Sequence, residues 1–305
     1  MAQRITLEHI RQWIAEGRGY GHGVCYKPWI KIQTRGSPSK GNLQFKFIPE
    51  LGRHSHLLSA GELRLVRFLL YLGVADLREQ FPCWPWPFHH PLYQHPNFNP
   101  SPILWGSGTL AIAEKIGVSH PRYPGSRLFH VPTIDILATV HGSPHFQAVA
   151  FAVKPDPNEQ NLSEWDATKL AIQKGYCEEL GIPWFLISAD NIPETLSENL
   201  KILLSYSAPK PELGELFTKF SNLLTPRLLD GEQISNCIAT AAKKLSVTKD
   251  FSNELFHRAL WFKTIPIDLR EPWVLGEPAQ LCDGQWIETT RKFLLGGRQE
   301  WQMTL

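Results

Sequence analysis

Two apolar runs joined by a turn cluster constrain this chain more than any other feature of its sequence. The runs cover residues 131–140 and 146–154, and the turn-forming stretch HGSPH stands between them. Runs of this length and composition are typical of strands, and so short a connection joins antiparallel neighbours. With the turn centred on Ser143–Pro144, the numbers of facing residues add up to about 287. We therefore expect a β-hairpin in which Asp135 faces Ala152.

Helix and strand patterns surround this hairpin in the first 190 residues. The stretch Ser59–Leu72 begins with a capping pair and carries apolar residues on most of its circumference, which predicts a largely buried helix. The apolar run Ile182–Ser188 predicts a strand buried on both faces. Further patterns indicate a strand at 74–81 and helices at 109–117 and 163–180. Apart from the short helix, the order is helix, strand, strand, strand, helix, strand, which is typical of an α/β domain.

The composition changes at two points along the chain. Residues 82–107 are rich in Pro, Trp and His, and because proline cannot donate to a β-ladder we expect a long loop or insertion there. After residue 189 come four helical patterns and a strand-like stretch, at 193–206, 212–224, 231–245, 251–262 and 264–269. Short helices followed by a wing-like strand predict a winged-helix-like domain. We therefore divide the chain into residues 1–189 and 190–305.

Length, composition and charge limit the class of protein. The 305 residues are enough for about two domains, and 43 % apolar with 20 % charged residues fit a globular protein. Because no run of about 18 apolar residues occurs, we expect no membrane span. The five cysteines form no close pairs, and the chain starts without the apolar core of a secretory signal. We therefore expect a protein of the reducing cytoplasm.

The net charge of +2 is too small for the strongly basic field of a solitary nucleic-acid binder, but it is unevenly distributed. Residues 1–60 hold nine Lys or Arg and only three acidic residues. Such an arm can follow a phosphate backbone, or it can be an ordinary solvated face. The sequence leaves both interpretations open.

The hairpin also brings reactive groups together. Because side chains alternate along a strand, Lys154 shares a face with three alanines, and Asp135 projects from the same face of the neighbouring strand. Glu62 lies in the first turn of the 59–72 helix with apolar neighbours, so we expect it to point inward. Two carboxylates can hold Mg²⁺ or Mn²⁺, and a lysine can stabilise charge on a phosphate, as phosphodiester hydrolysis requires. A capping glutamate and a plain cross-strand ion pair are the alternatives.

Other residues are candidates for binding. The histidines of the proline-rich stretch (His89, His90, His95) could bind a metal, although nothing fixes their geometry. His54 and His56 share a face of an extended segment close to Glu62. The aromatic residues of 84–105 suit DNA stacking or, as we prefer, docking of a partner protein. Cations beside the predicted 251–262 helix suit contact with DNA, but the helix itself carries few cations and suits protein binding equally well.

Seven strings stand in a fixed order across residues 16–188: EGRGYGHG (Glu16–Gly23), KPW (Lys27–Trp29), HLLSAGEL (His56–Leu63), DLREQFP (Asp76–Pro82), TID (Thr133–Asp135), AVKP (Ala152–Pro155) and GIPWF (Gly181–Phe185). Together they resemble the TnsA family, the endonuclease subunit of heteromeric cut-and-paste transposons. The element order matches the αβββαβ core of restriction-endonuclease-like nucleases. Beyond this range the resemblance is weaker and rests on ELFHRALWFKTIPIDL (Glu254–Leu269), where the family has a winged-helix domain.

The resemblance implies a catalytic site and a set of partners. It places catalytic roles on Glu62, Asp135 and Lys154, with Glu62, Asp135 and the Val153 carbonyl as ligands of Mg²⁺, for which Mn²⁺ can substitute. It implies cleavage of the 5′ strands at the ends of double-stranded transposon DNA. A TnsB-type recombinase would cut and join the 3′ strands, and a TnsC-type AAA+ regulator would link both to target choice. We expect DNA contacts from Arg18, His22, Lys27, His56, Arg258 and Lys263.

Two positions depart from the family pattern and keep other hypotheses open. Ala152 stands where the family often has Gln, and Gln173 lies near a position that is often Glu. Ala152 supplies no side-chain ligand, and the neutral Gln173 weakens a second metal site. Both fit one-metal chemistry, a slow nuclease or activity that needs the partner. They motivate the alternative of a structural adaptor with little activity that bridges end DNA, TnsB and TnsC. A stand-alone restriction or repair nuclease is a third hypothesis, against which the modest net charge argues.

Overall fold

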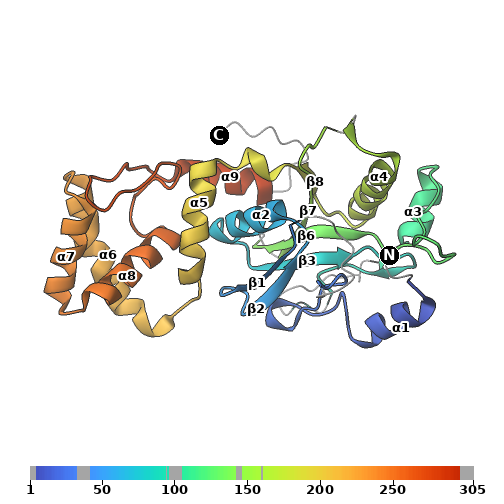
Figure 1. The fold of residues 1–305 in the computed structure, drawn as a ribbon, viewed down its shortest axis with the longest axis horizontal. Helices are drawn as coiled ribbons and strands as arrows, with labels where there is room; N and C mark the ends of the chain where they lie inside the picture. Colours follow the sequence, from blue (N-terminus) through green and yellow to red (C-terminus); the bar gives the residue numbers. More distant parts are fainter. Residues whose placement is uncertain are drawn as a thin grey trace.

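The computed structural model describes residues 5–32, 42–93, 95, 105–141, 146–158 and 161–295. The molecule is elongated, with a β-sheet and its flanking helices at one end and a group of helices at the other (Figure 1). No described helix is long and apolar enough to cross a membrane. Some of the basic residues counted in 1–60 (Arg4, Arg35 and Lys40) and one aromatic residue of 84–105 (Phe98) lie outside the described part of the chain.

The central sheet has four strands in the order β3-β6-β7-β8. β3 (Asp76–Pro82), β6 (Thr133–Val140) and β7 (Gln147–Val153) pair antiparallel, and β8 (Trp184–Ile187) pairs parallel to β7. Ile136 faces Phe151, so the predicted sum of 287 for the β6–β7 register is confirmed. The turn at residues 142–145 lies outside the described residues.

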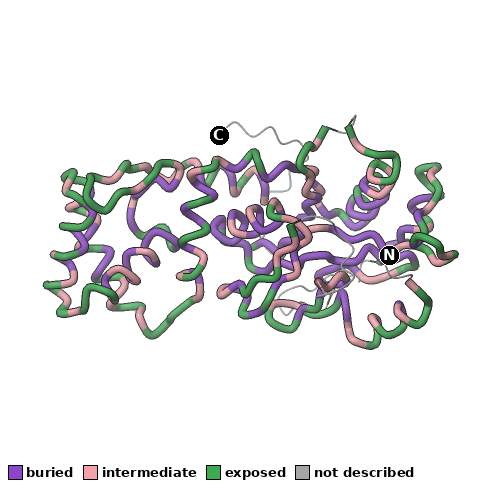
Figure 2. Tube along the Cα trace, in the orientation of Figure 1, coloured by how far each residue is buried: buried purple, intermediate pink, exposed green. Residues whose placement is uncertain are grey.

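Two helices cover the two faces of this sheet. α2 (Ala60–Tyr71) is capped by Ser59, and α4 (Glu164–Glu179) by Ser163. Alternate residues of β7 separate the two layers, because Val149 and Phe151 pack in the core of α2 whereas Ala148 and Ala150 pack with Tyr176 of α4. The helix α2 is largely buried, as its apolar circumference predicts (Figure 2). The predicted αβββαβ order is therefore confirmed.

Short elements surround this core. They are α1 (Leu7–Ala15), η1 (Gly23–Cys25), the antiparallel pair β1 (Gln44–Ile48) and β2 (Arg53–Leu57), the pair β4 (Phe88–His89) and β5 (Trp105–Gly106), and α3 (Thr109–Lys115). The strands β4 and β5 belong to the stretch 82–107, so that stretch is more ordered at its ends than a plain loop. Trp84 is buried against Trp29 and therefore serves the core rather than a docking partner.

Helices make up most of the remainder. The four predicted ones are confirmed as α5 (Glu194–Leu203), α6 (Gly214–Leu229), α7 (Ile234–Leu245) and α8 (Lys249–Trp261), with η3 (Ala189–Asn191), η4 (Leu204–Tyr206) and η5 (Pro211–Leu213) between them. The sequence analysis missed α9 (Gln285–Leu295). The strand predicted at 264–269 is wrong, because only a single bridge joins Ile267 to Leu281. One hydrophobic core runs from α2 across residue 190 into α8, and the winged-helix assignment stays a prediction.

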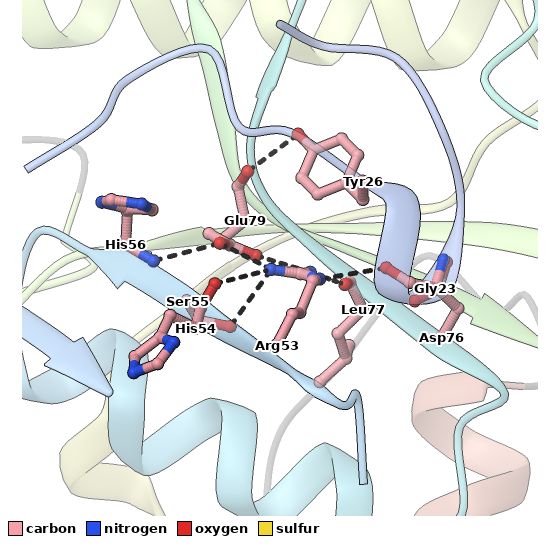
Figure 3. Close-up of polar contacts among 9 residues, drawn as sticks. All are labelled: Gly23, Tyr26, Arg53, His54, Ser55, His56, Asp76, Leu77 and Glu79. Carbon is pink, nitrogen blue, oxygen red and sulfur yellow. Dashed lines mark hydrogen bonds and ion pairs between the residues drawn. The ribbon is translucent and has the colours of Figure 1, made fainter. Parts of the chain in front are cut away.

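A buried ion pair joins the β1–β2 hairpin to the central sheet (Figure 3). Arg53 donates from Nη1 and Nη2 to the two carboxylate oxygens of Glu79, at 2.9 and 2.8 Å, and both side chains are more than 90 % buried. The same carboxylate accepts from the backbone N–H of His56, and the Glu79 carbonyl accepts from the Tyr26 hydroxyl. Arg53 also donates to the carbonyl of Leu77. Glu79 thus ties the N-terminal segment and β2 to β3.

We expect Arg53→Ala to lower the free energy of unfolding by about 3–5 kcal/mol, because it leaves the buried Glu79 carboxylate without its cation. Chemical denaturation checks this value. Lys201→Ala, which removes the exposed ion pair with Glu198, is the control and costs below about 1 kcal/mol. Equal losses in the two variants would show that the Arg53–Glu79 pair does not hold β2 in place.

Candidate active site

A pocket of about 650 Å³ opens where the first turn of α2 meets the ends of β6 and β7. Its lining includes all four residues that the sequence analysis places at the catalytic site: Glu62, Asp135, Val153 and Lys154. They come from three elements that are distant in sequence. The hairpin register brings Asp135 beside the end of β7, and the packing of α2 on the sheet brings Glu62 to both.

Glu62 is held by neutral donors. Its Oε2 accepts from the Leu58 N–H at 2.9 Å and from Gln80 Nε2 at 3.1 Å, and its own N–H donates to Ser59 Oγ at the helix cap. The side chain is buried. Burial raises the pKa of Glu62 well above its ordinary value, and the nearby negative charge of Asp135 raises it further. Glu62 is therefore both a cap residue and a wall of the pocket.

Asp135 lines the same pocket as Glu62 and is half-buried. Its Oδ2 accepts from the Val153 N–H at 2.8 Å. Burial raises the pKa of Asp135, although this hydrogen bond and the charges of Lys154 and Lys169 act in the opposite direction. Within the described residues neither Asp135 nor Glu62 forms an ion pair. Two carboxylates thus share one pocket, and neither forms an ion pair with a described Lys, Arg or His side chain.

Lys154 lies in the pocket but bonds to a residue that the sequence analysis did not assign to the site. Its Nζ is 2.8 Å from Asp166 Oδ1, and Lys169 Nζ is 3.3 Å from the same oxygen. Burial alone would raise the pKa of Asp166, but hydrogen bonds from Lys154 and Ser163 and the charge of Lys169 lower it to about 2. Asp166 therefore stays ionised and holds two cations at the rim of the pocket.

Gln80 is a second site residue that the sequence analysis missed. Its backbone is left-handed, at φ 49°, and it is the one residue of β3 that does not pair with β6, although the register is the same on both sides of it, at Glu79 and Phe81. This turn sends its amide into the pocket, where it donates to Glu62 and accepts from Thr133 Oγ1 at 3.0 Å. Strained backbone of this kind persists where the surroundings enforce it. No motif in DLREQFP signals such a turn.

Gln173 of α4 completes the far wall. Its Nε2 donates to the Thr133 carbonyl at 2.7 Å, so Thr133 links Gln173 to Gln80 and through it to Glu62. The Oε1 atom of Gln173 is buried and has no hydrogen-bond partner in the described structure. Ala152, the other departure from the family pattern, is fully buried and offers no side-chain ligand.

None of the six residues predicted to contact DNA lines the pocket. Arg18 is buried and pairs with Glu16, and Arg258 is buried in the helical core and pairs with Glu254. Burial leaves these two arginines no surface for a phosphate, so we assign them structural roles. The other four have internal partners: His22 the Tyr93 carbonyl, Lys27 the Glu16 carbonyl, His56 the Ile32 N–H and Lys263 the Tyr71 carbonyl. Their contact with DNA stays a prediction.

The histidines of the proline-rich stretch do not form a metal cluster in the described structure. His89 stacks on Tyr93 and Trp105, and the Nδ1 atom of His90 accepts from the N–H of Leu92. His95 contacts His22 edge to face. Each ring thus has a packing role.

The pocket can bind a hard cation. The described residues hold no group of three or more His, Cys, Asp or Glu side chains suited to a metal, and the acidic side chains of this pocket that could hold a cation are Glu62 and Asp135. Carboxylate oxygens suit Mg²⁺ or Mn²⁺ rather than Zn²⁺. Burial is the main cause of the raised pKa values of Glu62 and Asp135, and a divalent cation beside them would favour their ionised forms. Lys154 and Lys169 stand beside this position and can bind an anion such as a phosphate.

We expect Gln80→Ala to lower the free energy of unfolding by roughly 2–4 kcal/mol, because it leaves two buried partners unbonded and keeps the left-handed backbone. Gln80→Gly loses the same hydrogen bonds but relieves the backbone, so it should be about 1 kcal/mol more stable than Gln80→Ala. Urea denaturation of the pair measures the difference. An alanine variant as stable as the glycine variant would contradict the strained conformation.

Two comparisons place the chain among known proteins. A family model described as the N-terminal part of TnsA-like endonucleases matches residues 93–189, which include Asp135 and Lys154. Over 216 residues the chain is 32 % identical to the transposition protein TnsA of transposon Tn7 from Escherichia coli, a match that covers 70 % of this chain and 68 % of that protein. Together with the αβββαβ core and the pocket at its centre, these matches show that the chain belongs to the TnsA family of transposon endonucleases.

Proposed function

We propose that this protein is a Mg²⁺-dependent DNA endonuclease that cuts the 5′ strands at transposon ends and works with a TnsB-type recombinase. The observation that carries the proposal is the pair of carboxylates, Glu62 and Asp135. They share a pocket and form no ion pair with a basic side chain in the described structure. Placing two such charges together costs free energy, and a site that binds a divalent cation explains why they are kept. Family membership supplies the substrate class.

Each residue has a role in this proposal. Glu62 and Asp135 hold the cation, with the Val153 carbonyl as a further ligand, and Asp135 is oriented by the Val153 N–H. Bound Mg²⁺ would activate water and stabilise the leaving oxygen of the phosphodiester. Lys154 stabilises negative charge on the phosphate. To do so, its ammonium group gives up the hydrogen bond to Asp166 and binds the incoming phosphate instead. Gln80 fixes the orientation of the Glu62 carboxylate.

Partners and location follow the same reasoning. A TnsB-type recombinase would process the 3′ strands, and a TnsC-type AAA+ regulator would connect the complex to its target. The net charge of +2 suits a subunit that receives the DNA end from a partner, because few phosphate contacts give weak solitary binding. We further propose that the protein works in the cytoplasm, with the DNA.

A catalytically weak adaptor is the second candidate. Three observations favour it: Lys154 is engaged by Asp166, Gln173 is neutral, and Ala152 offers no ligand. Such an adaptor would connect DNA, TnsB and TnsC without cutting. A nuclease and an adaptor differ in whether the pocket binds a metal and whether the 5′ strand is cut.

We expect the wild type, with Mg²⁺ and its TnsB-type partner, to cut the 5′ strand of a labelled transposon-end duplex. Glu62→Gln, Asp135→Asn and Lys154→Ala should each lower the rate by about 10²-fold or more, since each removes stabilisation of the transition state. Lys201→Ala, on the surface of α5, is the control. Cutting of the 3′ strand by the partner with no 5′-strand cut by the wild type would favour the adaptor instead.

The raised carboxylate pKa values also predict a pattern of stability. A group whose pKa is raised by folding stabilises the protein below its ordinary pKa, and this contribution is lost as pH rises through the raised value. At pH 7 without metal, Asp135→Asn should therefore leave the free energy of unfolding unchanged or increase it. Mg²⁺ at 100 times its dissociation constant should stabilise the wild type by about 2.7 kcal/mol and the variant much less.

Denaturation with and without Mg²⁺ or Mn²⁺ measures both effects. Lys201→Ala should respond to the metal like the wild type. A metal response that Asp135→Asn retains in full would place the cation elsewhere.

A further inference from the structure

A small ordered hairpin stands beside the pocket and has no role in the chemistry described above. It comprises residues 121–130 and is called the arginine hairpin below. A bridge pairs Arg122 with Phe129, the Tyr123 N–H donates to the Leu128 carbonyl at 3.0 Å, and the His130 N–H donates to the Pro121 carbonyl at 2.8 Å. These bonds give the segment a fixed shape.

The hairpin is anchored to the core by Tyr123. This side chain is buried in a cluster with Trp29 and Trp84, and its hydroxyl accepts from the Val131 N–H. With the base fixed in this way, Arg122, Arg127 and Phe129 remain on the outside, where all three are exposed. The guanidinium of Arg122 lies over the Phe129 ring and donates to the Arg127 carbonyl. The two arginines are thus presented on a rigid support.

The hairpin is continuous with the rim of the pocket. Its last residue, His130, lines the pocket, and the His130 ring lies 5.8 Å from the ring of Trp165 in the first turn of α4. Lys169, one helical turn further on, stands over the same indole and also lines the pocket. A path of cations and aromatic rings therefore leads from Lys154 and Lys169 out to the arginine hairpin.

The hairpin segment carries charge of one sign, whereas the first turn of α4 beside it contains Glu164 and Asp166. Residues 116–134 contain Arg122, Arg127, His120 and His130 and no Asp or Glu. Neither arginine has an ion-pair partner within the described structure. The nearest rim carboxylate, Asp166, already holds two lysines. The surface is therefore suited to an anion that extends beyond the pocket, and a nucleic-acid backbone is an anion of that kind.

We propose that the arginine hairpin, together with Trp165 and Lys169 of α4, holds the backbone of the transposon-end duplex next to the phosphate that is cut. The proposal rests on the proposed nuclease function and adds where the DNA lies. A phosphate that enters the pocket belongs to a continuous DNA strand. The neighbouring phosphates of that strand must therefore cross the rim of the pocket. On the side formed by α4 they meet Lys169, Trp165 and then His130, the last residue of the arginine hairpin. These contacts are to the backbone, so they should not depend on base sequence.

Binding of a fluorescent transposon-end duplex, without metal so that no cutting occurs, tests the proposal. Arg127→Ala is the first variant, because no described hydrogen bond or ion pair uses its side chain. Arg122→Ala combined with Arg127→Ala is the second. Lys219→Ala is the matched control, since it removes one exposed cation from α6 in the helical end of the molecule (Figure 1). Thermal unfolding checks that every variant is folded.

Anisotropy titrations over about 50–200 mM salt give the slope of log affinity against log salt. We expect the slope to fall by about 1 for Arg127→Ala and by about 2 for the double variant, with lower affinity for end DNA and unrelated DNA alike. Lys219→Ala should match the wild type. Absence of binding by the wild type at the lowest salt, or equal slopes in wild type and folded variants, would overturn the proposal.

Cleavage assays separate this inference from the proposed function. If the wild type cuts the 5′ strand but Arg127→Ala binds DNA with unchanged affinity and slope, the inference fails and the nuclease stands. If Arg127→Ala keeps DNA affinity but loses only partner-dependent cutting, the hairpin contacts the TnsB-type protein and the inference is wrong. If the wild type never cuts while the salt slopes behave as expected, the DNA surface stands and the nuclease proposal fails.

Discussion

The Arg53–Glu79 ion pair is the interaction on which the arrangement of the site depends. The Glu79 carboxylate accepts two hydrogen bonds from Arg53 and one from the backbone of β2, and the Glu79 carbonyl accepts one from the Tyr26 hydroxyl. β2 leads directly to Leu58 and the cap of α2, and Gln80 follows Glu79 on β3. The pair therefore fixes, from two directions, the residues that bond to Glu62. Because it is buried, its loss would leave an uncompensated charge in the core.

The pocket collects several features that cost stability. Two carboxylates with raised pKa values line it, Gln80 has a left-handed backbone, and Gln173 has a buried oxygen without a partner. Elsewhere on the rim the charges are paired, since Asp166 holds both Lys154 and Lys169. Costs of this kind concentrated in one place are typical of a functional site rather than of a structural core. A divalent cation would relieve the first of them, the two carboxylates with raised pKa values.

Local rules explain which parts of this structure could be predicted from the sequence. The turn cluster and alternation set the β6–β7 register, and Ser59 with Glu62 marked the start of α2, so the positions of Asp135 and Glu62 followed. Gln80 and Asp166 were missed because their roles come from tertiary contacts: a break in the β3–β6 ladder for one, and the approach of Lys154 for the other. Burial of Arg18 and Arg258 was missed for the same reason, because charge alone predicts a surface position.

The most direct test of the account is to locate the metal. Crystals of the wild type and of Asp135→Asn grown with Mn²⁺ allow its position to be read from anomalous scattering, independently of any cleavage assay. The account predicts a peak between the Glu62 and Asp135 carboxylates in the wild type, and no peak there in Asp135→Asn. A wild-type pocket without a peak, or a peak that persists in Asp135→Asn, would contradict the assignment of these two residues as the metal ligands of the nuclease.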